Sequence, residues 1–127
     1  MKIRELAEKY NDYIIERRRF YHTILELNFE EVETTKAIAE DLKSMSIEVT
    51  TFPDYNGLVG HIRGGKSGKT VMLRADIDGL PVEEKTGLPF ASTNGNMHAC
   101  GHDAHIAMLL GAAKILVDIK DELEGNV

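Results

Sequence analysis

The residues of this sequence best suited to chemistry gather in one short run. Within the eight residues from His98 to His105 lie three of the five histidines, the only cysteine and one aspartate. Imidazole and thiolate groups are common ligands of zinc and related ions. In an extended segment Cys100 and His102 point the same way, and the positive end of a helix beginning near Asp103 favours a thiolate. We predict a metal site here, the alternative being a buried cysteine beside histidines that cap a helix.

Two ligands do not complete a zinc site, which normally has three or four. The residues that could complete it are His98, His105, Asp103 and Asp76, or residues outside this sequence. His102 and His105 are three positions apart and could share a helix face, but their spacing is not the His-Glu-x-x-His arrangement of metalloproteases. The sequence therefore predicts where the site lies and leaves its full ligand set open.

Two aspartates, Asp76 and Asp78, follow a continuously apolar stretch at residues 71–73. We predict a strand over residues 70–75 that is central and buried, because strands covered on both faces are apolar throughout. Sites in open α/β sheets form beyond the carboxyl ends of the strands. Asp76 is therefore a candidate metal ligand or a group that orients one, and the alternative is a pair of turn-forming aspartates.

Three other features are interpreted as structural. Residues 64–70 resemble a phosphate-binding loop, but Arg63 stands where the motif needs glycine, and a strand is predicted where the motif needs a helix. The adjacent Glu83 and Glu84 are interpreted as solvated loop carboxylates rather than an acid–base pair. The basic cluster at residues 17–19 is interpreted as a solvated helix face.

Apolar periodicity and turn residues predict the elements that must position the site. Helices are expected over residues 2–27, from an Asn28 N-cap to about residue 45, and from about residue 103 to 119. Strands are expected over residues 47–52, 58–63 and 70–75, the last two joined by a hairpin turn at residues 64–69. A long loop over residues 76–101 precedes the last helix. This order predicts an α/β fold with a mixed sheet flanked by helices.

Length and composition narrow the class of protein. The 127 residues suffice for one domain, and 21 acidic against 15 basic residues give a net charge of −6, which argues against nucleic-acid binding. No apolar run approaches the roughly 20 residues of a membrane span, and no signal peptide is expected from the charged first turn. One cysteine cannot form an internal disulfide, so we predict a cytoplasmic protein.

Five runs of the chain carry a resemblance to known proteins: residues 17–22, 26–31, 73–82, 86–92 and 97–105. They resemble the metal-dependent amidohydrolases of the aminoacylase and hippurate-hydrolase type, a branch of the zinc-peptidase superfamily, and the last run is the most specific. The resemblance implies that residues 1–127 form the N-terminal part of a zinc-peptidase-like catalytic domain. The implied reaction is hydrolysis of the amide bond of an N-acyl amino acid or related conjugate by metal-activated water.

The resemblance also implies roles for residues at matching positions. Cys100 is expected to be a thiolate ligand shared between two divalent ions, and His102 a ligand of one of them. Asp76 is expected to be the catalytic aspartate beside the ions, with Asp103 and His105 as supporting groups. Zinc or manganese is expected, and cobalt or nickel is compatible with such ligands.

The family's catalytic base belongs to an adjacent Glu-Glu pair in the next strand, followed by further histidines and an inserted dimerisation domain. None of these is among the 127 residues, and Glu83-Glu84 stands in the wrong place to be that pair. We therefore expect an incomplete catalytic domain that is inactive alone, from a full-length homodimer that acts on a small molecule and binds neither nucleic acid nor membrane. The alternatives are a truncated remnant, a half-protein completed by a second polypeptide, or a small Cys/His metal-binding module.

Overall fold

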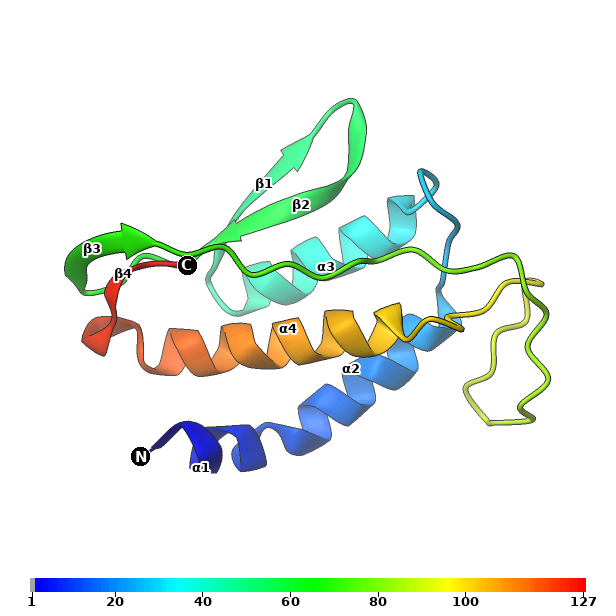
Figure 1. The fold of residues 1–127 in the computed structure, drawn as a ribbon, viewed down its shortest axis with the longest axis horizontal. Coiled ribbons are helices and arrows are strands. Elements are labelled where there is room, and N and C mark those ends of the chain that lie inside the picture. Colours follow the sequence, from blue (N-terminus) through cyan, green and yellow to red (C-terminus); the bar gives the residue numbers. More distant parts are fainter. Residues whose placement is uncertain (1) are drawn as a thin grey trace.

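The computed structural model describes residues 2–127 as helices on one side and short strands on the other (Figure 1). In chain order the elements are α1 (Lys2–Lys9), α2 (Asn11–Thr23), α3 (Val32–Ser44), β1 (Glu48–Phe52), β2 (Tyr55–His61), β3 (Lys66–Thr70), α4 (His102–Asp118), η1 (Lys120–Glu122) and β4 (Glu124–Asn126). This mixed arrangement of small sheets flanked by helices confirms the predicted fold class. None of the helices described is long and apolar enough to cross a membrane.

The core forms around α4, which lies between α2 and α3 (Figure 1). Tyr21 of α2, Ile38 and Leu42 of α3, and Ile106 and Leu110 of α4 are buried in one cluster. Burial of such side chains is the main favourable term in folding, so this cluster fixes the position of α4 and of the residues at its first turn.

The helices begin and end differently from the sequence prediction in two places. The helix expected over residues 2–27 is two helices, α1 and α2, which end by Thr23. Asn28 does not cap the next helix, which begins at Val32. Instead a Glu26 carboxylate oxygen accepts a 2.6 Å hydrogen bond from the Thr34 backbone N–H, and so satisfies a free donor of the first turn. The last predicted helix is confirmed by α4 to within one residue at each end.

The strands form two small sheets rather than one. Strands β1 and β2 pair antiparallel through a tight turn at Pro53–Asp54, and β3 pairs parallel with β4. The hairpin predicted at residues 64–69 is therefore wrong. Its glycines serve a different purpose, because a Cβ at Gly64, Gly65 or Gly68 would overlap the backbone of residues 121–125.

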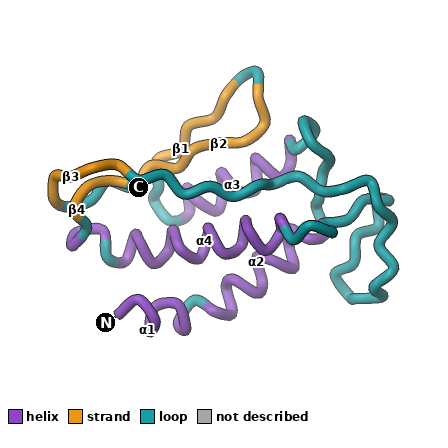
Figure 2. Tube along the Cα trace, in the orientation of Figure 1, coloured by secondary structure: helices purple, strands orange, loops and turns teal. Residues whose placement is uncertain are grey.

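The strand predicted over residues 70–75 is also wrong beyond Thr70, where β3 ends. Val71, Met72 and Leu73 are 57%, 81% and 47% exposed, and residues 71–78 belong to no strand of the described chain (Figure 2). The segment runs along a groove of about 670 Å³ that β2 and α4 also line. It is apolar as expected of a buried strand, but within residues 2–127 only Val71 makes a backbone bond to a neighbouring strand, donating to the Asn126 carbonyl at 2.9 Å.

Candidate metal centre

The turn before α4 gives the predicted metal-binding run its shape. Gly101 is the N-cap of the helix and has φ of 79°, a left-handed conformation that glycine adopts without strain. The backbone N–H groups of Ala104 and His105 donate to the Gly101 carbonyl, both at 3.1 Å. His102 is thus the first residue of α4, and His105 lies about one turn further along the same face.

Three potential ligands meet at this helix start. Asp76, His102 and His105 each offer one ligand atom, and these atoms lie within 4.8 Å of one another. The rings of His102 and His105 are stacked with their centroids 5.4 Å apart. Imidazole and carboxylate donors suit zinc, and carboxylates also suit manganese, so this donor set fits a divalent cation.

Asp78 contacts His102 directly. Its carboxylate Oδ1 lies 2.9 Å and its backbone carbonyl 3.0 Å from His102 Nδ1. When both acceptors hold a proton on Nδ1, Nε2 is the ring nitrogen that can bind a metal. From the sequence, Asp78 stands out only as a neighbour of Asp76. The Asp-x-Asp spacing at the end of the segment was the available signal for a second, orienting carboxylate.

The other predicted site residues are dispersed around this group. Cys100 is exposed and is not one of the three residues that converge. Asp76 pairs with Arg74 at 2.6 Å, a contact that a bound cation would compete with. His98 is 4% exposed, and neither of its ring nitrogens has a hydrogen-bond partner among the described residues. Burial lowers the pKa of His98, which favours the neutral ring.

Asp103 has no exposed surface and belongs to a buried charge network. Its Oδ2 lies 2.8 Å from Arg18 Nε and 2.7 Å from His22 Nδ1, and His22 Nε2 lies 2.7 Å from Glu84 Oε1. Glu84 was interpreted from the sequence as a solvated carboxylate, and that interpretation is wrong. In the basic cluster, Arg19 is exposed as a solvated face requires, whereas Arg17 and Arg18 are only partly exposed. A basic cluster and a histidine on one helix were the only local signals, because the partners are distant in sequence.

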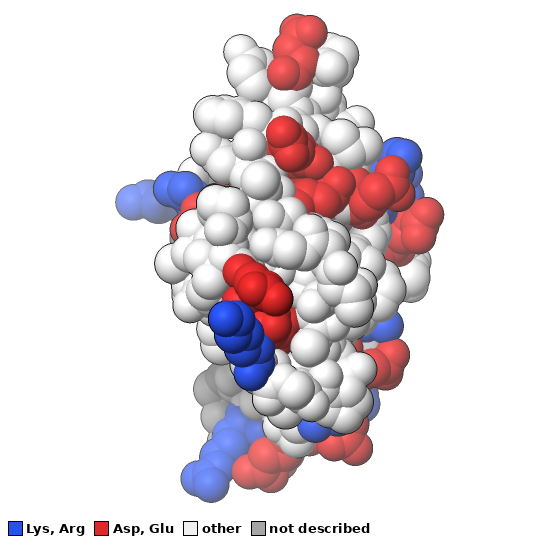
Figure 3. Space-filling view, turned by 90° about the vertical axis from the view of Figure 1, so that its right-hand side faces the viewer, with Lys and Arg blue, Asp and Glu red and all other residues white. Residues whose placement is uncertain are grey.

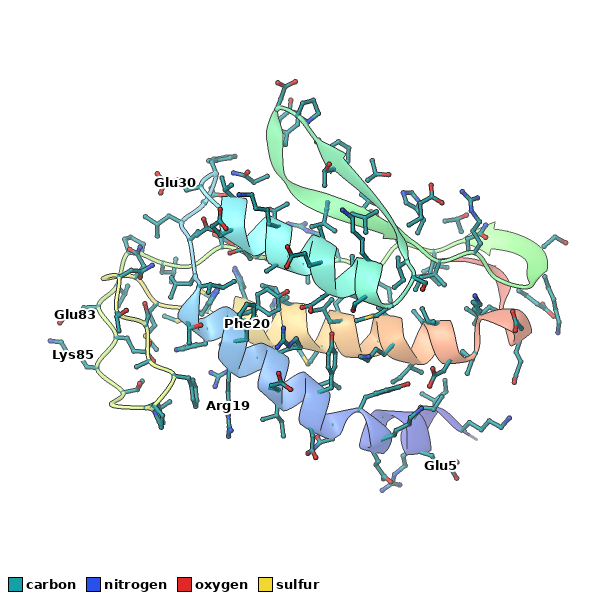
Figure 4. All side chains as sticks on the ribbon, turned by 180° about the vertical axis from the view of Figure 1, so that it is seen from behind. Glu5, Arg19, Phe20, Glu30, Glu83 and Lys85 are labelled. Carbon is teal, nitrogen blue, oxygen red and sulfur yellow. The ribbon has the colours of Figure 1, made fainter. Side chains whose placement is uncertain are left out.

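Glu83 and Glu84 have opposite surroundings. Glu83 is exposed and points away from the loop, as does Lys85 (Figure 4). The Glu84 side chain is shielded from solvent and accepts hydrogen bonds from the Ser92 backbone N–H at 2.5 Å and the Thr86 hydroxyl at 2.8 Å. Burial raises the pKa of Glu84, but these bonds and the one to His22 outweigh it, so the pKa is lowered overall. Seen from this end of the molecule, acidic side chains gather in the upper half of the view, and a basic side chain lies against acidic groups near its centre (Figure 3).

Comparison with known proteins places this geometry in a family. The sequence profile of peptidase family M20/M25/M40 matches residues 72–127, which include Asp76, Asp78 and the whole Cys/His run. The chain belongs to the M20 peptidase family. It is 48% identical to thermostable carboxypeptidase 1 of Saccharolobus solfataricus, over 99% of this chain and 33% of that protein. It is 44% identical to an N-acetylcysteine deacetylase of Bacillus subtilis, over 96% of this chain and 33% of that protein.

A solved M20 structure extends the likeness to the backbone. The chain matches the crystal structure of the Bacillus subtilis YXEP protein, described as a dinuclear metal binding peptidase of the M20 family. The TM-score is 0.89 at 43% identity, and the match covers 94% of this chain and 34% of that one. This M20 chain thus spans about a third of the length of the relatives it matches.

Proposed function

We propose that this chain supplies part of a two-metal centre that hydrolyses the amide bond of N-acyl amino acids or related conjugates. The observation that carries the proposal is the meeting of Asp76, His102 and His105 at the start of α4, with Asp78 on the far nitrogen of His102. The names of the relatives support the substrate class, since they include the N-acetylcysteine deacetylase and an N-acyl-L-amino acid amidohydrolase of Geobacillus stearothermophilus.

In this proposal the residues of the chain hold and orient the centre. Cys100 and His102 are the ligands, and Asp76 is the carboxylate beside the ions. Two divalent ions, zinc or manganese with cobalt or nickel as substitutes, would polarise the substrate carbonyl and lower the pKa of water. Asp78 keeps the His102 ring turned toward the centre, and Asp103 is a supporting group that anchors the first turn of α4 through Arg18.

We propose that the chain is inactive by itself. The resemblance assigns proton transfer to an adjacent Glu-Glu pair, and the pair present here is not suited to it. Glu83 is exposed on the loop, and both oxygens of Glu84 are engaged by Ser92, His22 and Thr86. A general base must reach the proton it removes, so the base would come from residues outside this sequence. The proposed whole protein is a cytoplasmic homodimer acting on small molecules.

A second function deserves a test because His105 belongs to the converging group. A small metal-binding module would use His105 as a full ligand, whereas the amidohydrolase proposal makes it a supporting group. Metal titration of His105→Ala separates the metal-binding module from the amidohydrolase, and His98→Ala is titrated in the same way. An affinity that falls about as far in His105→Ala as in His102→Ala favours the module. An affinity that depends on Cys100 and His102 alone favours the amidohydrolase.

The experiment for the main proposal starts from the source DNA. The nucleotide sequence beyond codon 127 is read, and the protein it encodes is assayed for release of amino acids from N-acetyl amino acids with zinc or manganese added. We expect metal-dependent hydrolysis that is lost in Cys100→Ser and His102→Ala. Failure of this protein to hydrolyse any N-acyl amino acid, or hydrolysis unaffected by both substitutions, would reject the proposal.

A further inference from the structure

His22 connects three separate parts of the chain through its two ring nitrogens. It lies in α2, while its partners Glu84 and Asp103 lie 62 and 81 residues further along, in the long loop and in α4. Both contacts are 2.7 Å, and His22 is only 2% exposed. The Phe90 ring packs edge-on against His22 with centroids 5.7 Å apart. The bridge is therefore short, closed to solvent and formed entirely by side chains distant in sequence.

The buried carboxylates at the two ends of this bridge each need a hydrogen-bonding partner. A carboxylate oxygen accepts a hydrogen bond from a ring nitrogen that carries a proton, and both His22 nitrogens lie at hydrogen-bonding distance from a carboxylate. Buried charges are costly unless they are paired and hydrogen-bonded. Removal of the imidazole would leave two carboxylates without solvent and without this donor, although Arg18 would still pair with Asp103. A histidine serving only to fill the core would need neither partner.

Each end of the bridge reaches a segment of the proposed centre. Asp103 is the residue after His102, and its Oδ1 accepts a 2.9 Å hydrogen bond from the Ala104 N–H in the first turn of α4. Glu84 accepts the Ser92 N–H and so closes the loop upon itself. That loop is tied at its base by a backbone pairing of Leu80 with Met97, directly before the Cys/His run.

We propose that His22 is a positioning residue for the metal centre. Its imidazole joins the loop to the first turn of α4 and so fixes the direction in which His102 and His105 present their rings. The inference rests on the metal site proposed above. It adds a residue that contacts none of the three converging groups and acts on them only through Asp103 and the loop.

The test uses two substitutions that each preserve half of the bridge. In His22→Asn the amide reaches the place of Nδ1 and can still meet Asp103. In His22→Gln the amide reaches the place of Nε2 and can still meet Glu84. The control is Tyr21→Phe, which removes a partly buried 2.6 Å hydrogen bond to Asp41 from the neighbouring residue of the same helix. The probe is Co²⁺, titrated into the chain in competition with a chelator.

Because both variants break the connection, we expect each to weaken Co²⁺ binding by roughly ten- to a hundredfold, as loss of groups that orient metal ligands does. Tyr21→Phe should lower stability and leave Co²⁺ affinity within about twofold of the original. Wild-type affinity in both folded His22 variants would overturn the proposal, as would an equal loss of affinity in Tyr21→Phe.

A metal-free measurement keeps the two proposals separable. Amide hydrogen exchange in the apo chain should be faster at Ser92 in His22→Asn, where Glu84 loses its contact with residue 22. It should be faster at Ala104 in His22→Gln, where Asp103 loses that contact and keeps only Arg18. If the original chain binds no Co²⁺, the metal-site proposal is rejected, and the exchange rates still test whether His22 holds the loop and the first turn of α4. Unchanged exchange at both amides would overturn the positioning role. If the His22 variants do not fold, Glu84→Gln takes their place under the same criteria.

Discussion

Asp78 and His102, 24 residues apart in the sequence, meet through a 2.9 Å contact between carboxylate Oδ1 and ring Nδ1. The Asp78 backbone carbonyl reaches the same nitrogen at 3.0 Å, so one residue holds the ring with two acceptors. This contact explains how a segment that belongs to no described strand reaches the proposed centre: it ends beside α4, where its second aspartate contacts the first helical residue.

Asp78→Asn should weaken divalent metal binding by roughly ten- to a hundredfold, because the neutral amide holds Nδ1–H less strongly and makes Nε2 a poorer donor to a metal. Zinc affinity measured by competition with a chromophoric chelator checks this. Asp54→Asn, in the exposed β1–β2 turn, is the control and should bind as the original chain does. Equal affinity in Asp78→Asn would show that the contact has no influence on the ligand.

Glu84 should make stability depend on acid pH. Its pKa in the folded chain lies below the ordinary value of 4.5, so the unfolded chain binds the proton more readily. The stabilisation is therefore present above that value and is lost as the pH falls through it toward the folded pKa. Urea unfolding at pH 7 and at about pH 4 gives the free energy of unfolding at each pH. Between these two values, that free energy should fall less in Glu84→Gln than in the original chain.

The matched control for this prediction is Glu83→Gln, which removes the same charge from the exposed neighbouring position. It should reproduce the pH dependence of the original chain. If the free energy of unfolding falls as far in Glu84→Gln as in the original chain, the Glu84 contacts with His22 and Ser92 do not stabilise its ionised form.

Gly79→Ala should destabilise the chain by about 1–3 kcal/mol, the usual cost of overpacking a core. A Cβ at this buried position would overlap the Leu25 side chain, which is 1% exposed, and the Gly79 N–H donates to the Glu26 carbonyl at 2.7 Å. Because Asp78 is the preceding residue, metal affinity should fall as well. Both are measured by urea unfolding and metal titration.

Gly57→Ala is the control for Gly79→Ala, because it separates a loss of stability from a loss of metal affinity. Its φ of 105° makes alanine strained, but a Cβ there meets open space, and the position lies in the β1–β2 hairpin. It should lower stability and leave metal affinity unchanged. A Gly79→Ala chain as stable as the original would contradict the packing argument.

The local parts of the site could be predicted from sequence. Ligand density and a following apolar helix located the Cys/His run at the start of α4, and the aspartates after residues 71–73 indicated that Asp76 would lie near it. The roles of Cys100, His102 and Asp76 remain predictions. They rest on residue type and resemblance, while the geometry gathers Asp76 with both His102 and His105.

The distant pairings could not be predicted from sequence. The glycine-rich residues 64–69 have the composition of a hairpin turn, but the lack of a Cβ at Gly64, Gly65 and Gly68 allows the close approach of residues 121–125. The apolar residues 71–73 fit a central strand, yet burial depends on neighbours that residues 2–127 do not place there. Glu84 has the sequence context of a solvated carboxylate, and only the fold brings His22 to it.

Cobalt titration of the chain tests the central claim most directly. The chain has one cysteine, so a thiolate-to-cobalt charge-transfer band can arise only from Cys100. We predict that the band grows to saturation with added Co²⁺, disappears in Cys100→Ser, and is strongly weakened in His102→Ala. Cobalt binding without the band, or no cobalt binding at all, would contradict the assignment of a metal centre to Cys100 and His102.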